Sequence, residues 1–123
     1  MKALVVDDSK AIRSILRKTL KEIGVEVIAE ATHGVEALSR LRETGPLDLT
    51  LVDWNMPEMN GFDFLCAVRR DRAYDRMRVV MVTTETETAQ MGRALEAGAN
   101  EYIMKPFTAD VLREKLALLG IEC

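Results

Sequence analysis

The sequence has few of the residues that build disulfide-linked or metal-stapled domains. It contains two cysteines, one histidine and three prolines among 123 residues. Cys66 and Cys123 do not have Cys-x-x-Cys spacing and no histidine cluster accompanies them, so neither a disulfide framework nor a cysteine-ligated metal site is predicted. We expect two reduced thiols and a fold stabilised by an apolar core.

Long hydrophobic runs are also missing. The apolar stretch in MKALVVDDS is too short for a signal sequence or a membrane span, and two acids follow it at once. We therefore expect a cytoplasmic protein that does not bind membranes. The net charge of −3 gives no long-range attraction to nucleic acid. Five arginines lie in segment 69–78, but Asp71 and Asp75 interrupt them, and we interpret the segment as a solvated face.

The overall composition is typical of one globular domain. Hydrophobic residues make up 48% of the chain and charged residues 30%, which suits a folded protein and argues against disorder. A chain of 123 residues is about one domain long. No linker rich in Ser, Gly or Pro divides the chain, so we expect a single domain over residues 1–123.

Apolar runs of strand length alternate with segments of helical period. ALVVD at 3–7 is followed by an apolar stripe from Ile12 to Ile23, and Gly24 then ends the predicted helix. The same alternation predicts strands at 25–30, 49–53, 78–83 and 100–104 and helices at 35–43, 62–71, 87–97 and 108–119. Five strand–helix units with short connections predict an α/β fold, a parallel sheet with helices on both faces.

Charged and hydroxyl side chains follow the predicted strands. In open parallel sheets, ligands bind beyond the carboxyl ends of the strands, so these positions are the first candidates for a site. In chain order they are Asp7 and Asp8, Asp53, Thr83 and Thr84, and Lys105. One strand-end acid by itself is weak support, since such residues often cap the next helix. The joint arrangement carries the hypothesis.

Three carboxylates at one edge need a positive partner. At about 4 Å and an effective dielectric near 20, two of them repel by roughly 4 kcal/mol. A hard divalent cation such as Mg2+ binds through oxygens and would offset this, and Lys105 supplies a second positive charge. A carboxylate can also act as a nucleophile and form an acyl phosphate. The inventory therefore suits phosphoryl transfer.

Four ordered motifs carry a resemblance to a known family. They are VDDS at 6–9, DWNMPEMNG at 53–61, VTTE at 82–85 and KPF at 105–107. With these motifs the chain resembles, over essentially its whole length, the receiver domain of bacterial two-component response regulators, most closely the stand-alone chemotaxis type. The resemblance implies a flavodoxin-like (βα)5 three-layer sandwich, and its strand order of 2-1-3-4-5 is taken from the family.

The resemblance also implies a metal-dependent phosphoacceptor. Asp53 would take the phosphoryl group from a histidine kinase's phosphohistidine or from a small phosphodonor. Asp8, Asp53 and the main-chain carbonyl of Asn55 would ligate Mg2+ or Mn2+, and Asp7 would hold the ion through water. The family is one of signalling proteins rather than enzymes, although its members assist their own phosphorylation and dephosphorylation.

Further roles follow from the family pattern around the phosphoacceptor. Thr83 would bond a phosphoryl oxygen and Lys105 would stabilise its charge. Tyr102 stands where the family has an aromatic that turns inward on activation, as Thr83 moves toward the phosphate; a half-buried tyrosine that never switches remains an alternative. The family usually has a cis peptide bond before Pro106.

Other matching positions would tune the site or contact partners. Asn55 and Glu85 flank the site and resemble those of fast-cycling chemotaxis members, which favours a short-lived phosphorylated state. Thr84 stands where the family often has alanine, so we expect narrower access. The family's output surface is the fourth helix, the last strand and the last helix, and the candidates on it are Gln90, Arg93, Met104, Val111 and Lys115.

Two other classes share parts of the pattern and fit less well. A flavodoxin-like cofactor binder needs a phosphate loop rich in Ser, Thr or Gly after the first strand, where this chain has two acids. A haloacid-dehalogenase-type phosphatase also uses an aspartate nucleophile with Mg2+. It places a second aspartate two residues later, and Asn55 occupies that place here.

Three outputs stay open within the receiver interpretation. The protein could bind a motor-switch component, relay its phosphoryl group to a histidine phosphotransfer domain, or act as a phosphate sink. The last predicted helix ends about four residues before Cys123, so we expect no DNA-binding or enzymatic output domain. Output would then require a protein–protein contact, made by a monomer.

Overall fold

The architecture is given by a computed structural model that describes residues 1–84 and 90–120. The strands are β1 (Lys2–Val6), β2 (Glu26–Ala31), β3 (Leu49–Asp53), β4 (Arg78–Thr83) and β5 (Glu101–Met104). The helices in the described ranges are α1 (Lys10–Glu22), α2 (Gly34–Thr44), α3 (Gly61–Arg69), α4 (Met91–Glu96) and α5 (Ala109–Leu118), with a short 3-10 turn, η1 (Arg72–Tyr74).

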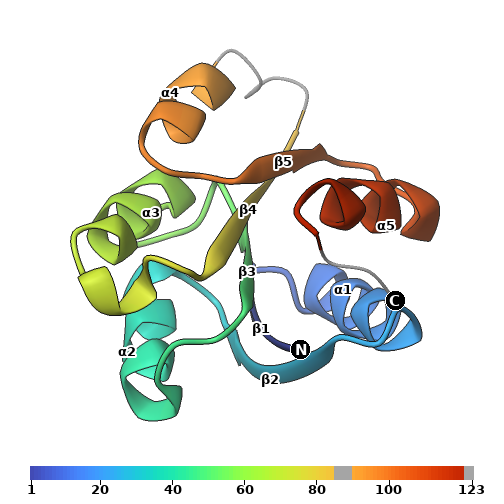
Figure 1. The fold of residues 1–123 in the computed structure, drawn as a ribbon, viewed down its shortest axis with the longest axis horizontal. Coiled ribbons are helices and arrows are strands. Elements are labelled where there is room, and N and C mark those ends of the chain that lie inside the picture. Colours follow the sequence, from blue (N-terminus) through green and yellow to red (C-terminus); the bar gives the residue numbers. More distant parts are fainter. Residues whose placement is uncertain (85–89, 121–123) are drawn as a thin grey trace.

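The five strands form one parallel sheet in the order β2-β1-β3-β4-β5, which confirms the expected flavodoxin-like fold. Helices α1 and α5 cover one face and α2, α3 and α4 cover the other, which gives three layers (Figure 1). The central strand β3 is buried along its whole length, as its apolar run predicted. All five strands therefore end at the same edge of the sheet.

Each face of the sheet has its own apolar core. On one face, Phe64 and Leu65 of α3 pack with Met81 of β4 and Ala94 of α4. On the other face, α1 and α5 contribute the buried leucines Leu16, Leu20, Leu112 and Leu116. The helices are thus fixed against the sheet on both sides, and the strand ends between them become a rigid platform.

Predicted and observed elements differ mainly at two helix ends. The helix predicted at 62–71 ends at Arg69, because Asp71 caps the turn η1 by accepting a hydrogen bond from Ala73 N at 2.9 Å. The helix predicted at 87–97 corresponds to α4, which spans Met91–Glu96 in the described chain. Residues 87–89 of that prediction lie outside the described residues.

The interpretation of segment 69–78 as a solvated face is wrong for Arg69. Its guanidinium donates hydrogen bonds of 2.8 to 2.9 Å to the main-chain oxygens of Tyr74, Met77 and Gly98 and to Asn100 Oδ1. These bonds tie the end of α3 to η1 and to the turn before β5. The other arginines of the segment are exposed or half-buried.

The structure also bears on membrane-spanning helices and on one of the two cysteines. None of the helices within residues 1–84 and 90–120 is long and apolar enough to cross a membrane. Cys66 is a half-buried free thiol, whereas Cys123 lies outside the described residues.

Candidate functional site

Three carboxylates converge at the carboxyl edge of the sheet. Asp7 and Asp8 follow β1, Asp53 ends β3, and oxygens of the three side chains lie within 4.8 Å of one another. Asp7 is 1% exposed and Asp53 is 6% exposed, whereas Asp8 is exposed. The cluster therefore has a buried floor and one side that faces solvent.

Lys105 brings one positive charge into this cluster. Its Nζ donates to Asp7 Oδ2 at 3.1 Å and to Asp53 Oδ1 at 3.2 Å. Burial alone would lower the pKa of Lys105, but the two carboxylates outweigh it, so its pKa lies above the ordinary value for lysine. Lys105 is therefore a permanent cation at neutral pH. The peptide bond between Lys105 and Pro106 is cis.

The loop after β1 is held by hydrogen bonds on both sides of Asp7. Asp7 N donates to Ala31 O of β2 at 3.0 Å, and Asp7 Oδ1 accepts from Ser9 N at 2.8 Å. Ser9 is the N-cap of α1, since its hydroxyl accepts from Ile12 N at 3.3 Å. The helix-capping role that a strand-end acid often takes is thus filled by Ser9.

Gly61 allows the loop after β3 to fold back onto the strand. Its N donates to Trp54 O at 2.9 Å, and a Cβ at this position would overlap the main-chain carbonyl of Asp53. Only glycine lets α3 begin this close to the strand end. Asn55 lies in the same loop and is exposed.

An aromatic pair joins the loop after β3 to α3, and an arginine of α4 packs on it. The buried Trp54 lies with its ring centroid 5.5 Å from that of Phe62 on α3. The Arg93 guanidinium of α4 lies 4.9 Å from the Phe62 ring centroid, within the range of a cation–π interaction. Arg93, predicted only as a partner contact, therefore also contacts α3.

The end of β4 places Thr83 and Thr84 beside the cluster. Asp53 pairs with Val82 in the sheet, and Lys105 N donates to Thr83 O at 2.6 Å. Thr83 is fully buried, and its hydroxyl donates to Thr84 O at 3.3 Å. Thr84 is exposed. Glu85, predicted to tune the site, lies outside the described residues.

Tyr102 lies on β5 with a half-buried ring that packs against the apolar core. The Lys115 Nζ of α5 lies 4.7 Å from the ring centroid and 3.4 Å from Glu101 Oε1. The remaining candidates for partner contacts, Gln90, Arg93, Met104 and Val111, are exposed. The five candidates thus gather on α4, β5 and α5 and at their ends.

One residue that the sequence analysis did not single out reaches the cluster from α1. Arg13 Nη1 donates to the main-chain oxygen of Asp7 at 2.7 Å. In the sequence, Arg13 is one of several basic residues of a predicted helix, and no motif marks it. Only the packing of α1 against the strand ends reveals this contact.

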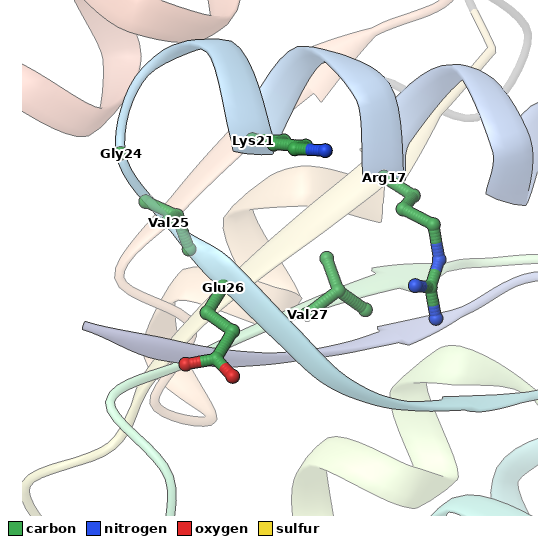
Figure 2. A pocket seen from close by; sticks show the side chains of 6 residues that line it. All are labelled: Arg17, Lys21, Gly24, Val25, Glu26 and Val27. Carbon is green, nitrogen blue, oxygen red and sulfur yellow. The ribbon is translucent and has the colours of Figure 1, made fainter.

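The pocket drawn in Figure 2 lies away from the acids. It has a volume of about 470 Å3 and is lined by the end of α1 and the start of β2, including Arg17, Lys21 and Glu26. Glu26 begins its strand, so this pocket is at the amino edge of the sheet, opposite the strand ends that carry the cluster.

The donors of the cluster fit a hard divalent cation. Three carboxylates face one ammonium group, which leaves an excess of negative charge in a partly buried place. Carboxylate and carbonyl oxygens are the ligands that Mg2+ and Mn2+ prefer. Close carboxylates with an accessible side are therefore chemically suited to bind such an ion and a phosphoryl oxygen together.

Comparisons with known proteins point to one family. The family model for the response regulator receiver domain matches residues 3–117. Chemotaxis protein CheY1 of Helicobacter pylori is 47% identical over 119 residues, which cover 97% of this chain and 96% of that protein. The chemotaxis protein CheY homolog of Campylobacter jejuni is 48% identical over 116 residues, which cover 94% of this chain and 89% of that protein.

Solved structures agree with this. Chemotaxis protein CheY4 of Vibrio cholerae superposes with a TM-score of 0.84 at 36% identity, over 98% of this chain and 97% of that one. The fold is thus shared with a chemotaxis protein along nearly the whole chain.

Proposed function

This chain belongs to the response regulator receiver domain family, and on that basis we propose that it accepts a phosphoryl group on Asp53 and signals through its α4, β5 and α5 surface. The proposed receiver domain spans residues 1–123. The observation that carries the proposal is the cluster of three carboxylates within 4.8 Å, with Lys105 Nζ at 3.2 Å from Asp53 Oδ1.

Asp53 is the proposed nucleophile. A carboxylate oxygen of Asp53 attacks the phosphorus of a phosphohistidine on a sensor histidine kinase, or of a small phosphodonor. The new P–O bond forms as the bond to the leaving group breaks. In phosphohistidine this is the P–N bond, whose electron pair returns to the imidazole nitrogen, and in acetyl phosphate it is a P–O bond, whose electron pair leaves with acetate. Asp53 is nearly buried at the end of β3 and its Oδ1 accepts from Lys105 Nζ, which supports a nucleophile held in a fixed position.

Asp7, Asp8, Asp53 and the main-chain carbonyl of Asn55 are the proposed ligands of Mg2+ or Mn2+, with Asp7 acting through water. Such an ion neutralises charge on the transferred phosphoryl oxygens and on the carboxylates. The mutual proximity of the three acids supports this set. Lys105 holds the buried acids and remains protonated, so it can also contact a phosphoryl oxygen.

Thr83 and Tyr102 are the proposed switch. The Thr83 hydroxyl donates to Thr84 O at 3.3 Å, a long bond that a phosphoryl oxygen would replace. Movement of Thr83 toward the phosphate would leave space for the half-buried ring of Tyr102. Asn55, Thr84 and Glu85 are the proposed tuning positions.

The proposed partners are a sensor histidine kinase and a downstream protein such as a motor-switch component. The names of the chemotaxis relatives favour this output over a phosphorelay or a phosphate sink. The proposed partner contacts are Gln90, Arg93, Met104, Val111 and Lys115. We further propose a monomer in the cytoplasm with a short-lived phosphorylated state.

Labelling with acetyl phosphate tests the central step. With Mg2+, the native protein should incorporate phosphate, Asp53→Asn should incorporate none, and Asp63→Asn, which changes an exposed acid of α3, should label normally. Beryllofluoride with Mg2+ should also change the fluorescence of Trp54. Absence of both labelling and a fluorescence change in the native protein would overturn the proposal.

A binding experiment separates the outputs. Beryllofluoride-bound protein that captures a motor-switch component, when the free protein does not, supports the chemotaxis role. Rapid transfer of phosphate from Asp53 to a phosphotransfer histidine, without such capture, supports the relay instead.

A further inference from the structure

Arg13 connects the acid cluster to two other elements. From α1 its Nη1 donates to Asp7 O at 2.7 Å, and its Nε donates to Glu30 Oε1 of β2 at 3.2 Å. Glu30 is itself held from the other side, since Arg17 Nε donates to its Oε2 at 2.9 Å. Figure 2 shows Arg17 extending from α1 toward β2. The Arg13 side chain is only 15% exposed, so its guanidinium is fixed in one orientation.

The oxygen that Arg13 binds belongs to the peptide group between Asp7 and Asp8. The orientation of that planar group determines where the Cα of Asp8 lies, and thereby the point from which its side chain extends. Asp7 is held by Ala31, Ser9 and Lys105. Asp8, in contrast, is exposed. Arg13 holds the carbonyl of the peptide that leads to Asp8.

We propose that Arg13 is a positioning residue for the divalent-cation site, which it serves by fixing the Asp7–Asp8 peptide so that the Asp8 carboxylate faces Asp7 and Asp53. This inference rests on the proposed function, because it presupposes that the three acids bind a metal ion. Glu30 supports the role by accepting from the Nε of Arg13. A residue in this position touches neither the metal nor the phosphoryl group.

The sign of a mutational effect separates positioning from charge. Arg13 is a cation near three acids, so on Coulomb's law its removal alone should strengthen the binding of a divalent cation. If Arg13 instead orients Asp8, its removal should weaken binding, because a misplaced ligand contributes less. Loss of an outer residue that orients a ligand typically weakens metal binding about 10- to 100-fold.

Mn2+ binding gives a direct test that needs no phosphodonor. The free ion is measured by electron paramagnetic resonance during titration of the native protein, Arg13→Met, Arg13→Lys and Lys10→Met. We expect Arg13→Met to raise the dissociation constant roughly tenfold, with Arg13→Lys intermediate. Lys10→Met removes the same charge from the first turn of α1 and should bind as tightly as the native protein or more tightly.

A second variant keeps the charge of Arg13 and covers the case in which Arg13→Met does not fold. Glu30→Gln weakens the support of the guanidinium and should raise the dissociation constant about threefold, a smaller loss than direct removal of Arg13. Because Glu30→Gln also removes a negative charge, Glu43→Gln, which makes the same charge change at an exposed acid of α2, is its control and should bind Mn2+ nearly as tightly as the native protein. Far-UV circular dichroism establishes that each titrated variant is folded.

The outcomes are distinguishable. Unchanged or tighter Mn2+ binding by folded Arg13→Met overturns the inference and leaves the proposed function intact. If Arg13→Met is unfolded, unchanged binding by both Arg13→Lys and Glu30→Gln overturns it in the same way. A native protein that binds no Mn2+ overturns the inference together with the proposed metal site.

Discussion

Replacing Asp8 with asparagine should stabilise the protein in the absence of metal, and the distances in the acid cluster give the size of the effect. Oxygens of Asp8 lie within 4.8 Å of those of Asp7 and Asp53. At this separation two charges repel by about 3.5 kcal/mol at a dielectric of 20 and by about 0.9 kcal/mol in water.

Because Asp8 is exposed to solvent, its repulsion from Asp7 and Asp53 is closer to the value in water than to the value at a dielectric of 20. Two such pairs then sum to roughly 2–4 kcal/mol, and attraction to Lys105 removes about 1 kcal/mol of this. We therefore expect Asp8→Asn to raise the free energy of unfolding by about 1–3 kcal/mol in EDTA.

Urea denaturation followed by far-UV circular dichroism at pH 7 measures this change. Asp110→Asn is the matched control, because it makes the same charge change at an acid whose side chain is 84% exposed at the start of α5. The control should shift stability by less than about 0.5 kcal/mol. At a Mg2+ concentration about 100 times the dissociation constant, the native protein should gain about 2.7 kcal/mol. Asp8→Asn should gain much less.

Two results would contradict this reasoning. If Asp8→Asn is no more stable than the native protein in EDTA, the three carboxylates do not repel one another as their distances require. If Mg2+ stabilises both proteins equally, Asp8 is not a ligand.

Three further predictions concern the surroundings of the cluster. Because the pKa of Lys105 is raised on folding, its stabilising charge is fully present below about pH 10.4 and is lost as pH rises through the higher folded-state pKa. The stability gap between native and Lys105→Met, measured by urea unfolding, should stay level from about pH 7 to 9 and shrink above about pH 10.5. Gly61→Ala should cost about 1–3 kcal/mol in thermal unfolding, since its Cβ meets the Asp53 carbonyl; a wild-type melting temperature would refute the close approach. Arg69→Met should cost about 3–5 kcal/mol in urea, because three main-chain carbonyls lose a charged donor, whereas the exposed Arg70→Met should change little.

The alternation of strand and helix patterns was enough to predict the main elements of the fold. Apolar runs such as LTLVD at 49–53 are buried on both faces and became β3. The order of the strands came from family resemblance, because several orders bury the same runs equally well. Helix ends were less predictable: α3 ends at Arg69 because a cap two residues later begins a new turn.

Contacts of long side chains could not be predicted. Arg69 and Arg70 are adjacent and identical in the sequence, yet one binds main-chain carbonyls and the other faces solvent. The contact between Arg93 and the Phe62 ring is a similar case. The helical period predicts which face of a helix a side chain lies on, but it does not predict which ring of a neighbouring helix packs against that side chain.

The sequence by itself determined that acids and a lysine stand at the ends of parallel strands, because apolar runs end at those residues and parallel strands end at one edge. Only the tertiary structure decided which residues outside the acid cluster contact the main chain of its aspartates. It placed Gly61 against the Asp53 carbonyl and Arg13 against the peptide between Asp7 and Asp8. Those contacts depend on how α1 and α3 pack against the sheet, and such packing is specified by the whole core rather than by any local motif.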